Sequence, residues 1–264
     1  MTVLSLTRPA PRPLVVLTAA SVALLMLTLL WASADPRLLD GVPVWAKPMK
    51  FALSFVVYFA TLALVEARLS PGWREGRVMH LTVTVLTVAM LAEMGYIIAQ
   101  AALGEASHFN FSTPYNAIMY GTVMAFGAIL LVLGVAVIGE VVRRDAAADL
   151  GPGLRAGIFA GFVLTFVLTM ITAMTLASLA GHHVGVPGPE ARVIPLLGWS
   201  AAVGDLRPAH FLALHAMQVL PLAGLWIDRR GGRAVTVLWI ALAYVLLTLA
   251  VFAQGLMGLP LIRL

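Results

Sequence analysis

Cysteine is absent from the 264 residues, and charged side chains are scarce. Without cysteine the chain has no disulfide, no thiolate metal site and no cysteine nucleophile. Asp, Glu, Lys and Arg together make up 11% of the residues, whereas soluble globular proteins carry about 25%. So few charges cannot cover the surface of a soluble protein of this length. The composition therefore excludes a soluble fold.

Hydrophobic residues are abundant instead, at 61%, and they gather in seven long runs. A helix that crosses a bilayer needs roughly 20 mostly apolar residues. The runs also lack the alternation of barrel strands. The sequence therefore predicts an all-α, polytopic membrane protein, a single domain over residues 1–264 that forms a bundle of seven transmembrane helices. The spans are expected at residues 14–34, 48–69, 78–103, 114–139, 154–180, 208–227 and 234–257.

The first run has an alternative interpretation as a signal peptide. Arg8 and Arg12 precede it, and Ala32-Ser33-Ala34 resembles a cleavage site. Its apolar part is about 20 residues long, however, and the core of a signal peptide usually has about 7–15. We expect the span to be retained; cleavage before Asp35 would leave six spans.

Basic residues indicate the orientation of the chain. Most of the 17 Lys and Arg residues lie in the N-terminal segment and in the loops that follow the second, fourth and sixth spans. The positive-inside rule then predicts a cytoplasmic N-terminus and an external C-terminus. We interpret the net charge of +5 as orientation charge, so the expected partner is the lipid bilayer and not nucleic acid.

Polar side chains on the predicted outer side define a candidate pocket. A carboxylate within a span is costly and tends to face the protein interior. We expect Glu93 to do so, and the alternative is a protonated side chain bonded to a neighbouring helix. The connection over residues 181–207 would cover the pocket between spans three and six as a lid. The pocket residues are expected to be Glu93, Tyr96, Gln100, Arg207, Phe211, His215 and Gln218.

The same outer layer offers ligands for a cofactor. His215 would be one axial ligand of haem b, and His108, His182 or His183 the other. Lys47, Lys50 and Arg207 would neutralise the propionates. The alternative is that the histidines are interfacial side chains and that the lysines reach lipid head groups.

A metal ion is another hypothesis for this layer. His210 and His215 lie five residues apart, about 140° around a helix, and cannot chelate one ion together. A site would therefore use His215 with His183 from the long connection. In span five, the Thr165, Thr169, Thr172 and Thr175 stripe and the Gly157-x-x-x-Gly161 pattern are expected to serve close helix packing, not a transport path.

Three segments resemble a known family. They are Trp45-Ala-Lys-Pro-Met-Lys-Phe51, Ser107-His-Phe-Asn110 and Gly204-Asp-Leu-Arg-Pro-Ala-His-Phe-Leu-Ala-Leu-His215. Together they are similar to segments of a family of bacterial multi-span inner-membrane proteins to which no activity is attached. The resemblance implies a location in the bacterial inner membrane and nothing about chemistry.

Four functions compete at this point. The first is a haem b redox protein. The second is a binding or transport protein for a small anion or lipid-like molecule, with Glu93 as the proton-coupled group. The third is a metal-dependent hydrolase at the outer face, and the fourth is a structural membrane protein without ligand. The sequence decides neither between enzyme and non-enzyme nor the oligomeric state.

Overall fold

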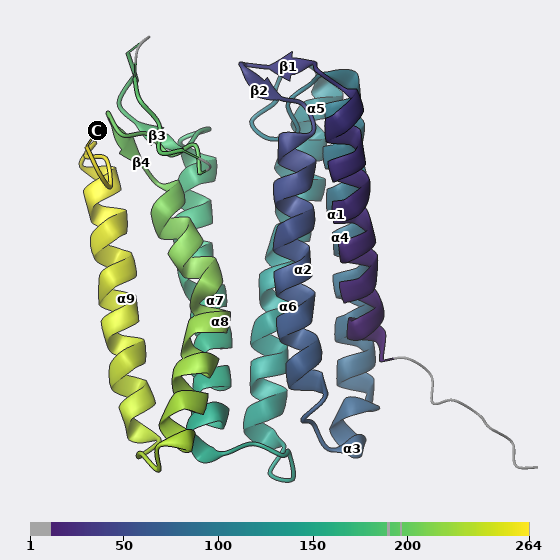
Figure 1. Cartoon of the computed structure of the whole chain (residues 1–264), viewed down its shortest axis with the longest axis vertical. Helices are drawn as coiled ribbons and strands as arrows, with labels where there is room; N and C mark the ends of the chain where they lie inside the picture. Colours follow the sequence, from purple (N-terminus) through teal and green to yellow (C-terminus); the bar gives the residue numbers. More distant parts are fainter. Residues whose placement is uncertain (1–11, 189–190, 196, 264) are drawn as a thin grey trace, which may run out of the picture. The chain divides into compact units, whose positions relative to one another are not determined.

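The protein is an all-α, multi-pass membrane protein. A computed structural model describes residues 12–188, 191–195 and 197–263 (Figure 1). Within these residues seven helices are long and apolar enough to cross a membrane, which confirms the predicted fold class. The contacts divide the chain into two compact units. Unit 1 is Met1–Ala67 with Met90–Ser107, and unit 2 is Arg68–Ala89 with His108–Leu264. The single domain stays a prediction.

The spans begin and end within a few residues of the predicted positions, except that the fourth continues to Arg144. That span combines three helical segments, and short strands lie in two of the connections. The helices are α1 (Pro13–Ala34), α2 (Ala46–Glu66), α3 (Pro71–Arg74), α4 (Arg77–Leu103), α5 (Pro114–Ile118), η1 (Met119–Met124), α6 (Ala125–Arg144), α7 (Pro152–Ser178), α8 (Arg207–Arg229) and α9 (Val235–Leu256). The strands are β1 (Leu38–Leu39), β2 (Val42–Pro43), β3 (His183–Val184) and β4 (Gly204–Asp205).

Local chemistry explains where the fourth span begins. Thr113 Oγ1 accepts a hydrogen bond of 3.1 Å from the backbone N–H of Asn116 and so caps the start of α5. Pro114 occupies the first turn, where its missing N–H costs no helical bond. The following segment η1 is π-helical, with one extra residue per hydrogen-bonded turn. The hydrophobic pattern does not reveal this change of helix type.

Unit 1 consists of α1, α2 and the second half of α4. α1 and α2 pack along each other, and a tight turn with Asp40 and Gly41 at positive φ joins β1 to β2. Arg37 ties this connection to the end of α4 because it donates to the Ala102 carbonyl at 3.0 Å. The same side chain pairs with Asp35 at 2.7 Å.

Unit 2 centres on α7 and α8, which lie side by side with α9 against both (Figure 1). A Cβ atom on Gly161 would lie 2.6 Å from the Ala216 carbonyl oxygen, so the helices approach too closely for any larger residue there. The predicted close packing at the glycine pattern is confirmed. At the far end of α8, Asp228 accepts hydrogen bonds of 2.7 Å from the N–H groups of Gly153 and Leu154 and caps α7.

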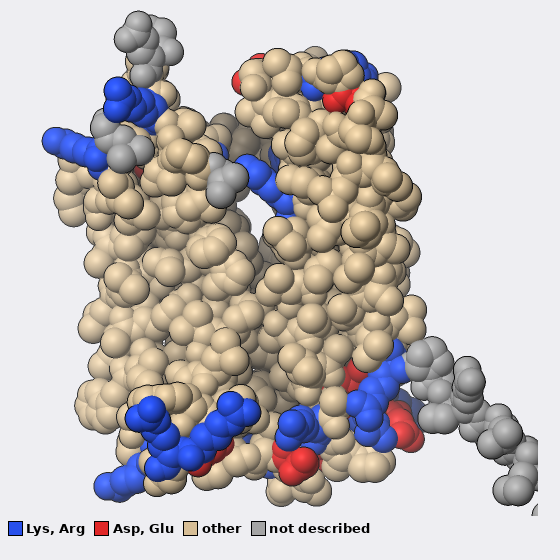
Figure 2. Space-filling view, viewed as in Figure 1, with Lys and Arg blue, Asp and Glu red and all other residues tan. Residues whose placement is uncertain are grey.

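The long connection between α7 and α8 folds back on itself. β3 pairs with β4 in antiparallel fashion, and this register places His183 opposite Asp205. A bridge between Val193 and Ser200 closes a second turn. Residues 189, 190 and 196 lie outside the described residues. In Figure 2 the charged side chains on the visible face lie mainly toward the two ends of the helices, which leaves an apolar belt for the bilayer.

Candidate functional site

The second half of α4 carries three buried polar side chains in unit 1. Glu93, Tyr96 and Gln100 are 4%, 6% and 3% exposed. They follow one another at helical spacing, so they share one face of the helix. The burial of Glu93 confirms the prediction that its carboxylate faces protein and not lipid.

Lys47 is the charged neighbour of Glu93. It lies half-buried in the first turn of α2 and interacts electrostatically with the Glu93 carboxylate. Lys50, one turn later, is exposed. The two lysines that the sequence grouped together therefore differ in their surroundings, and only Lys47 belongs to the buried polar layer of unit 1.

Gln100 holds the end of α4 in place. Its side-chain Nε2 donates to the Ala106 carbonyl oxygen at 3.2 Å, and its backbone carbonyl accepts a hydrogen bond of 2.8 Å from the N–H of Glu105. Ser107 follows in this loop and is 2% exposed. The loop therefore closes the buried layer at the predicted outer end of the unit.

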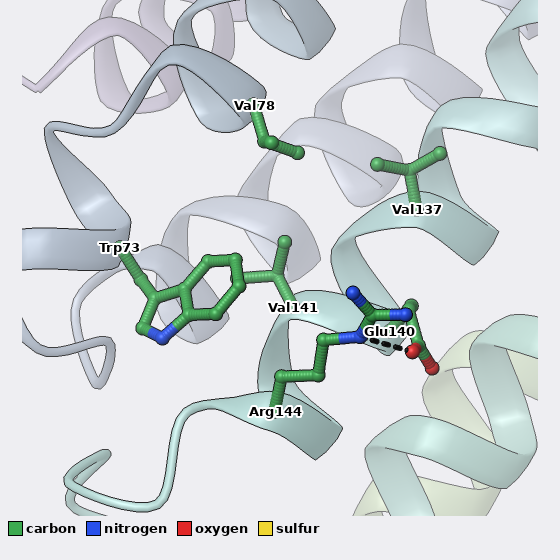
Figure 3. A pocket seen from close by; sticks show the side chains of 6 residues that line it. All are labelled: Trp73, Val78, Val137, Glu140, Val141 and Arg144. Carbon is green, nitrogen blue, oxygen red and sulfur yellow. Dashed lines mark hydrogen bonds and ion pairs between the residues drawn. The ribbon is translucent and has the colours of Figure 1, made fainter.

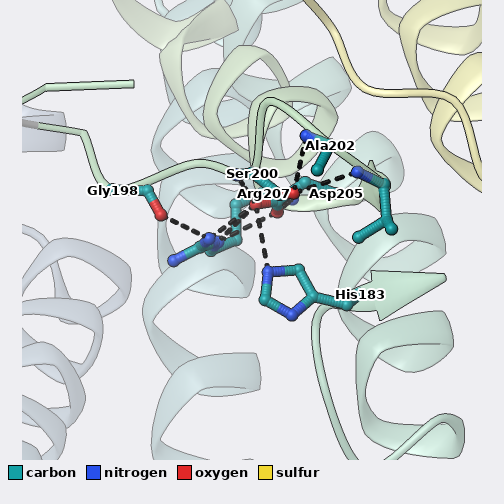
Figure 4. A network of polar contacts seen from close by, with 7 residues as sticks. His183, Gly198, Ser200, Ala202, Asp205 and Arg207 are labelled. Carbon is teal, nitrogen blue, oxygen red and sulfur yellow. Dashed lines mark hydrogen bonds and ion pairs between the residues drawn. The ribbon is translucent and has the colours of Figure 1, made fainter. Parts of the chain in front are cut away.

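A polar network in unit 2 surrounds Asp205, whose side chain is 0% exposed (Figure 4). Arg207 pairs with the Asp205 carboxylate at 2.5 Å and also donates to the Gly198 carbonyl at 2.7 Å. The N–H of Ser200 donates to the same carboxylate at 2.8 Å. Burial alone would raise the pKa of Asp205, but the hydrogen bonds from Arg207 and Ser200 outweigh it and lower the pKa.

Two histidines adjoin this network. The Nε2 of His183 lies 3.7 Å from the carboxylate of Asp205, and the rings of His182 and His183 are 4.2 Å apart. Burial lowers the pKa of His183 although the negative charge of Asp205 acts in the opposite direction. Asp205 lies one residue before Leu206, the N-cap residue of α8, and its carboxylate also accepts a hydrogen bond of 3.0 Å from the N–H of Arg207.

The remaining candidate histidines occupy separate places. His215 Nδ1 lies 3.2 Å from the Oε1 of Gln218, and its ring is 4.2 Å from that of Phe211. His108 packs against Tyr120 at 5.7 Å. Within the described ranges no three histidine, aspartate or glutamate side chains gather in a way that could hold a metal ion. The metal and haem sites stay predictions.

Two hollows open on the surface of unit 2. The first measures about 250 Å³, is entirely apolar and includes Phe211 from the predicted pocket; it is lined by Trp199, Pro208, Phe211, Leu212, Val251 and Leu261. The second, of about 210 Å³, lies at the other end of the helices (Figure 3) and is lined by Trp73, Val78, Val137, Glu140, Val141 and Arg144. Glu140 pairs there with Arg144 at 2.5 Å. The sequence did not predict this second hollow.

The predicted pocket residues belong to both units. Glu93, Tyr96 and Gln100 lie in unit 1, whereas Arg207, Phe211, His215 and Gln218 lie in unit 2. The expected juxtaposition of spans three and six therefore stays a prediction.

A sequence signal does connect the two sets. The first turns of α2 contain Lys47-Pro-Met-Lys-Phe51, and α8 opens with Arg207-Pro-Ala-His-Phe211. Both segments place a basic residue, then proline, in the first turn of a span. The recurrence singles out Lys47 and Arg207 as the basic residues of the two buried networks.

The pH dependence of stability should report on His183. Because the pKa of His183 is lowered in the folded state, the unfolded chain binds the proton more tightly than the folded protein does. Neutral His183 therefore contributes to the free energy of unfolding above the unfolded pKa of about 6.5, and this contribution is lost as the pH falls below that value. The loss amounts to about 1.4 kcal/mol for each unit by which the pKa is lowered. Thermal unfolding of wild type and His183→Gln at pH 7 and pH 5 measures it. His80→Gln is the control, and an unchanged pH dependence in His183→Gln contradicts the prediction.

In three comparisons with known proteins, no protein-family model, curated protein or solved structure matched this chain. The function therefore has to be argued from the chemistry of the buried networks themselves.

Proposed function

We propose that this multi-pass membrane protein binds a small anionic molecule in unit 1 and couples that binding to protonation of Glu93. The observation that carries the proposal is the buried carboxylate of Glu93 within α4, with Lys47 of α2 as its charged neighbour. Ionisable side chains inside membrane spans commonly mark proton or substrate pathways. The location in a bacterial inner membrane and the cytoplasmic N-terminus belong to this proposal.

Charge balance provides the mechanism. While Glu93 is ionised, its negative charge compensates the ammonium group of Lys47. When Glu93 takes up a proton, the ammonium group loses this compensation and attracts another anion. A proton and a monovalent anion then enter together, and the net charge of the site stays the same. Because the net charge of the site does not change, this joint entry avoids the free-energy cost of an uncompensated charge in surroundings of low dielectric constant.

Proteoliposomes loaded with the pH indicator pyranine test the proposal. We expect an inward gradient of chloride or nitrate to acidify the lumen with wild-type protein for at least one of these monovalent anions. Glu93→Gln should abolish the coupled proton movement, because the amide cannot take up a proton in this pH range.

Glu75→Gln is the matched control, since Glu75 is an exposed acid at the end of α3. It should retain the wild-type signal. Wild-type protein that moves no protons with either anion contradicts the proposal, and so does full coupling in Glu93→Gln.

Haem b binding in unit 2 is the second candidate, favoured by the orientation of His215. Its Nδ1 is engaged by Gln218 at 3.2 Å, which leaves Nε2 as the ligand atom. The hollow beside its neighbour Phe211 measures only about 250 Å³, below the roughly 300–1,000 Å³ of typical small-molecule sites. Haem is therefore the weaker candidate. A Soret band that His215→Ala removes and His80→Ala retains would establish it.

A further inference from the structure

Two threonines in the α7–α8 interface differ from the other hydroxyl residues of the spans. Thr165 and Thr169 are 1% and 5% exposed, and their hydroxyls have no hydrogen-bond partner among the residues that the structure describes. Elsewhere Ser21, Thr82 and Thr248 each donate to the carbonyl four residues earlier. Such back-bonding satisfies a hydroxyl within its own helix. Thr165 and Thr169 retain an unused hydrogen-bonding capacity inside the interface.

A second group in the same interface lacks its usual partner. Pro221 lies inside α8 and has no N–H, so the carbonyl of Met217, four residues earlier, loses its helical donor. In a membrane such a carbonyl is satisfied by a neighbouring Ser or Thr side chain or by ordered water. The Met217 carbonyl therefore needs a hydrogen-bond donor from outside α8.

The packing brings these groups to one stretch of the interface. The Cβ position of Gly161 lies 3.1 Å from the Cδ atom of Pro221, and Thr165 follows one turn later on the same face of α7. Toward the other end, Thr172 Oγ1 lies 2.9 Å from His210 Nδ1. Since the helices are antiparallel, Thr165 and Thr169 lie between these two contacts.

The facing side of α8 offers no polar side chain along this stretch. Ala213 and Ala216, both 0% exposed, lie between His210 and Pro221 on the buried side of α8. Alanine methyl groups are small and cannot accept or donate a hydrogen bond. The two hydroxyls and the freed carbonyl therefore need a partner that neither helix supplies as a side chain.

We propose that this partner is water bound at the proline break of α8. A first molecule bridges the Thr165 hydroxyl and the Met217 carbonyl. A second molecule binds the Thr169 hydroxyl, between the first water and the contact of Thr172 with His210. Buried waters typically make about three hydrogen bonds to polar groups that lack other partners. The threonine stripe is thus a hydration site in addition to a packing surface. It lies in unit 2 and is independent of the proposed anion site.

A double-mutant cycle with Pro221→Ala tests the first water. Thr165→Val keeps the shape of the side chain but removes the hydroxyl, and we expect a decrease in Tm of about 2–4 °C. The decrease should shrink in the Pro221→Ala background, because the Met217 carbonyl regains an N–H donor there. Thr165→Ser keeps the hydroxyl and should retain the Tm of wild type more closely than Thr165→Val.

Thr248→Val is the matched control, since Thr248 is 0% exposed and bonded within its own helix. Its effect should be the same in both backgrounds. If the interface is dry, Thr165→Val removes an unsatisfied buried hydroxyl, and Tm stays unchanged or rises in both backgrounds. That result would overturn the proposal.

Hydroxyl-radical labelling by X-ray irradiation tests the site in wild-type protein. Radicals form from water next to the labelled side chain, so a buried methionine reacts quickly only when water is bound beside it. Met217 and Met124 are 2% and 3% exposed. We expect Met217 to be labelled several-fold faster than Met124. Equally slow labelling of both residues contradicts the proposal, whether or not any variant folds.

Discussion

Lys47→Met should destabilise the protein by roughly 1–3 kcal/mol, the cost of leaving a buried polar group without compensation. The methionine fills the space of the lysine stem but leaves the carboxylate of Glu93, which is 4% exposed, without its compensating charge. Denaturant unfolding in detergent measures the change in the free energy of unfolding.

Lys50→Met is the matched control, because Lys50 lies one turn later on α2 and is exposed. Its effect should be small. The double variant Lys47→Met/Glu93→Gln should recover most of the stability, since neither charge remains.

Glu93→Gln alone should be well tolerated, because the long side chain of half-buried Lys47 can extend its ammonium group toward the interface. Equal losses in the free energy of unfolding for Lys47→Met and Lys50→Met would contradict the prediction that Lys47 compensates the charge of Glu93.

Arg207→Met should cause a larger loss, about 3–5 kcal/mol. Asp205 is fully buried, and the guanidinium group of Arg207 supplies its charge compensation at 2.5 Å. Arg207 also anchors the long connection through the Gly198 carbonyl, so its removal should expose residues 197–205 to limited proteolysis. Unfolding and proteolysis of the same preparation measure both effects.

Arg37→Met is a close control, because Arg37 pairs with Asp35 in the same Asp-x-Arg geometry. There the side chains are 52% and 13% exposed, against 32% and 0% for Arg207 and Asp205. Solvent therefore screens the first pair, and its removal should cost far less. Similar losses for Arg37→Met and Arg207→Met would contradict the role that we assign to burial.

Hydropathy predicted the seven spans because the constraint is local. Each span must satisfy its own backbone hydrogen bonds in the bilayer, so it appears as one uninterrupted apolar helix. The same local logic applies to the Thr113 cap, where a few neighbouring residues decide the outcome. The burial of Glu93 followed from its charge alone, since a carboxylate is too costly to face lipid.

The partners of the polar side chains could not be predicted in this way. His183 meets Asp205 because β3 pairs with β4 across a connection of 19 residues between the two strands, and no spacing rule encodes that register. Lys47 and Lys50 look equivalent in sequence, yet only the packing of unit 1 turns Lys47 inward. Arg155 lies near the start of α7, just after the connection that follows the fourth span, and it donates to the carbonyls of Val142 and Ala148 at 2.7 and 3.2 Å, a role that the charge pattern does not predict.

The sequence by itself determined that this is a membrane protein of seven helical spans, because composition and run length act within each segment. The tertiary structure alone decided which polar groups meet: Arg207 and His183 with Asp205, and Thr172 with His210. The physical reason is that electrostatic and hydrogen-bond partners act over a few ångströms in space, and residues far apart in the chain come that close only through helix packing.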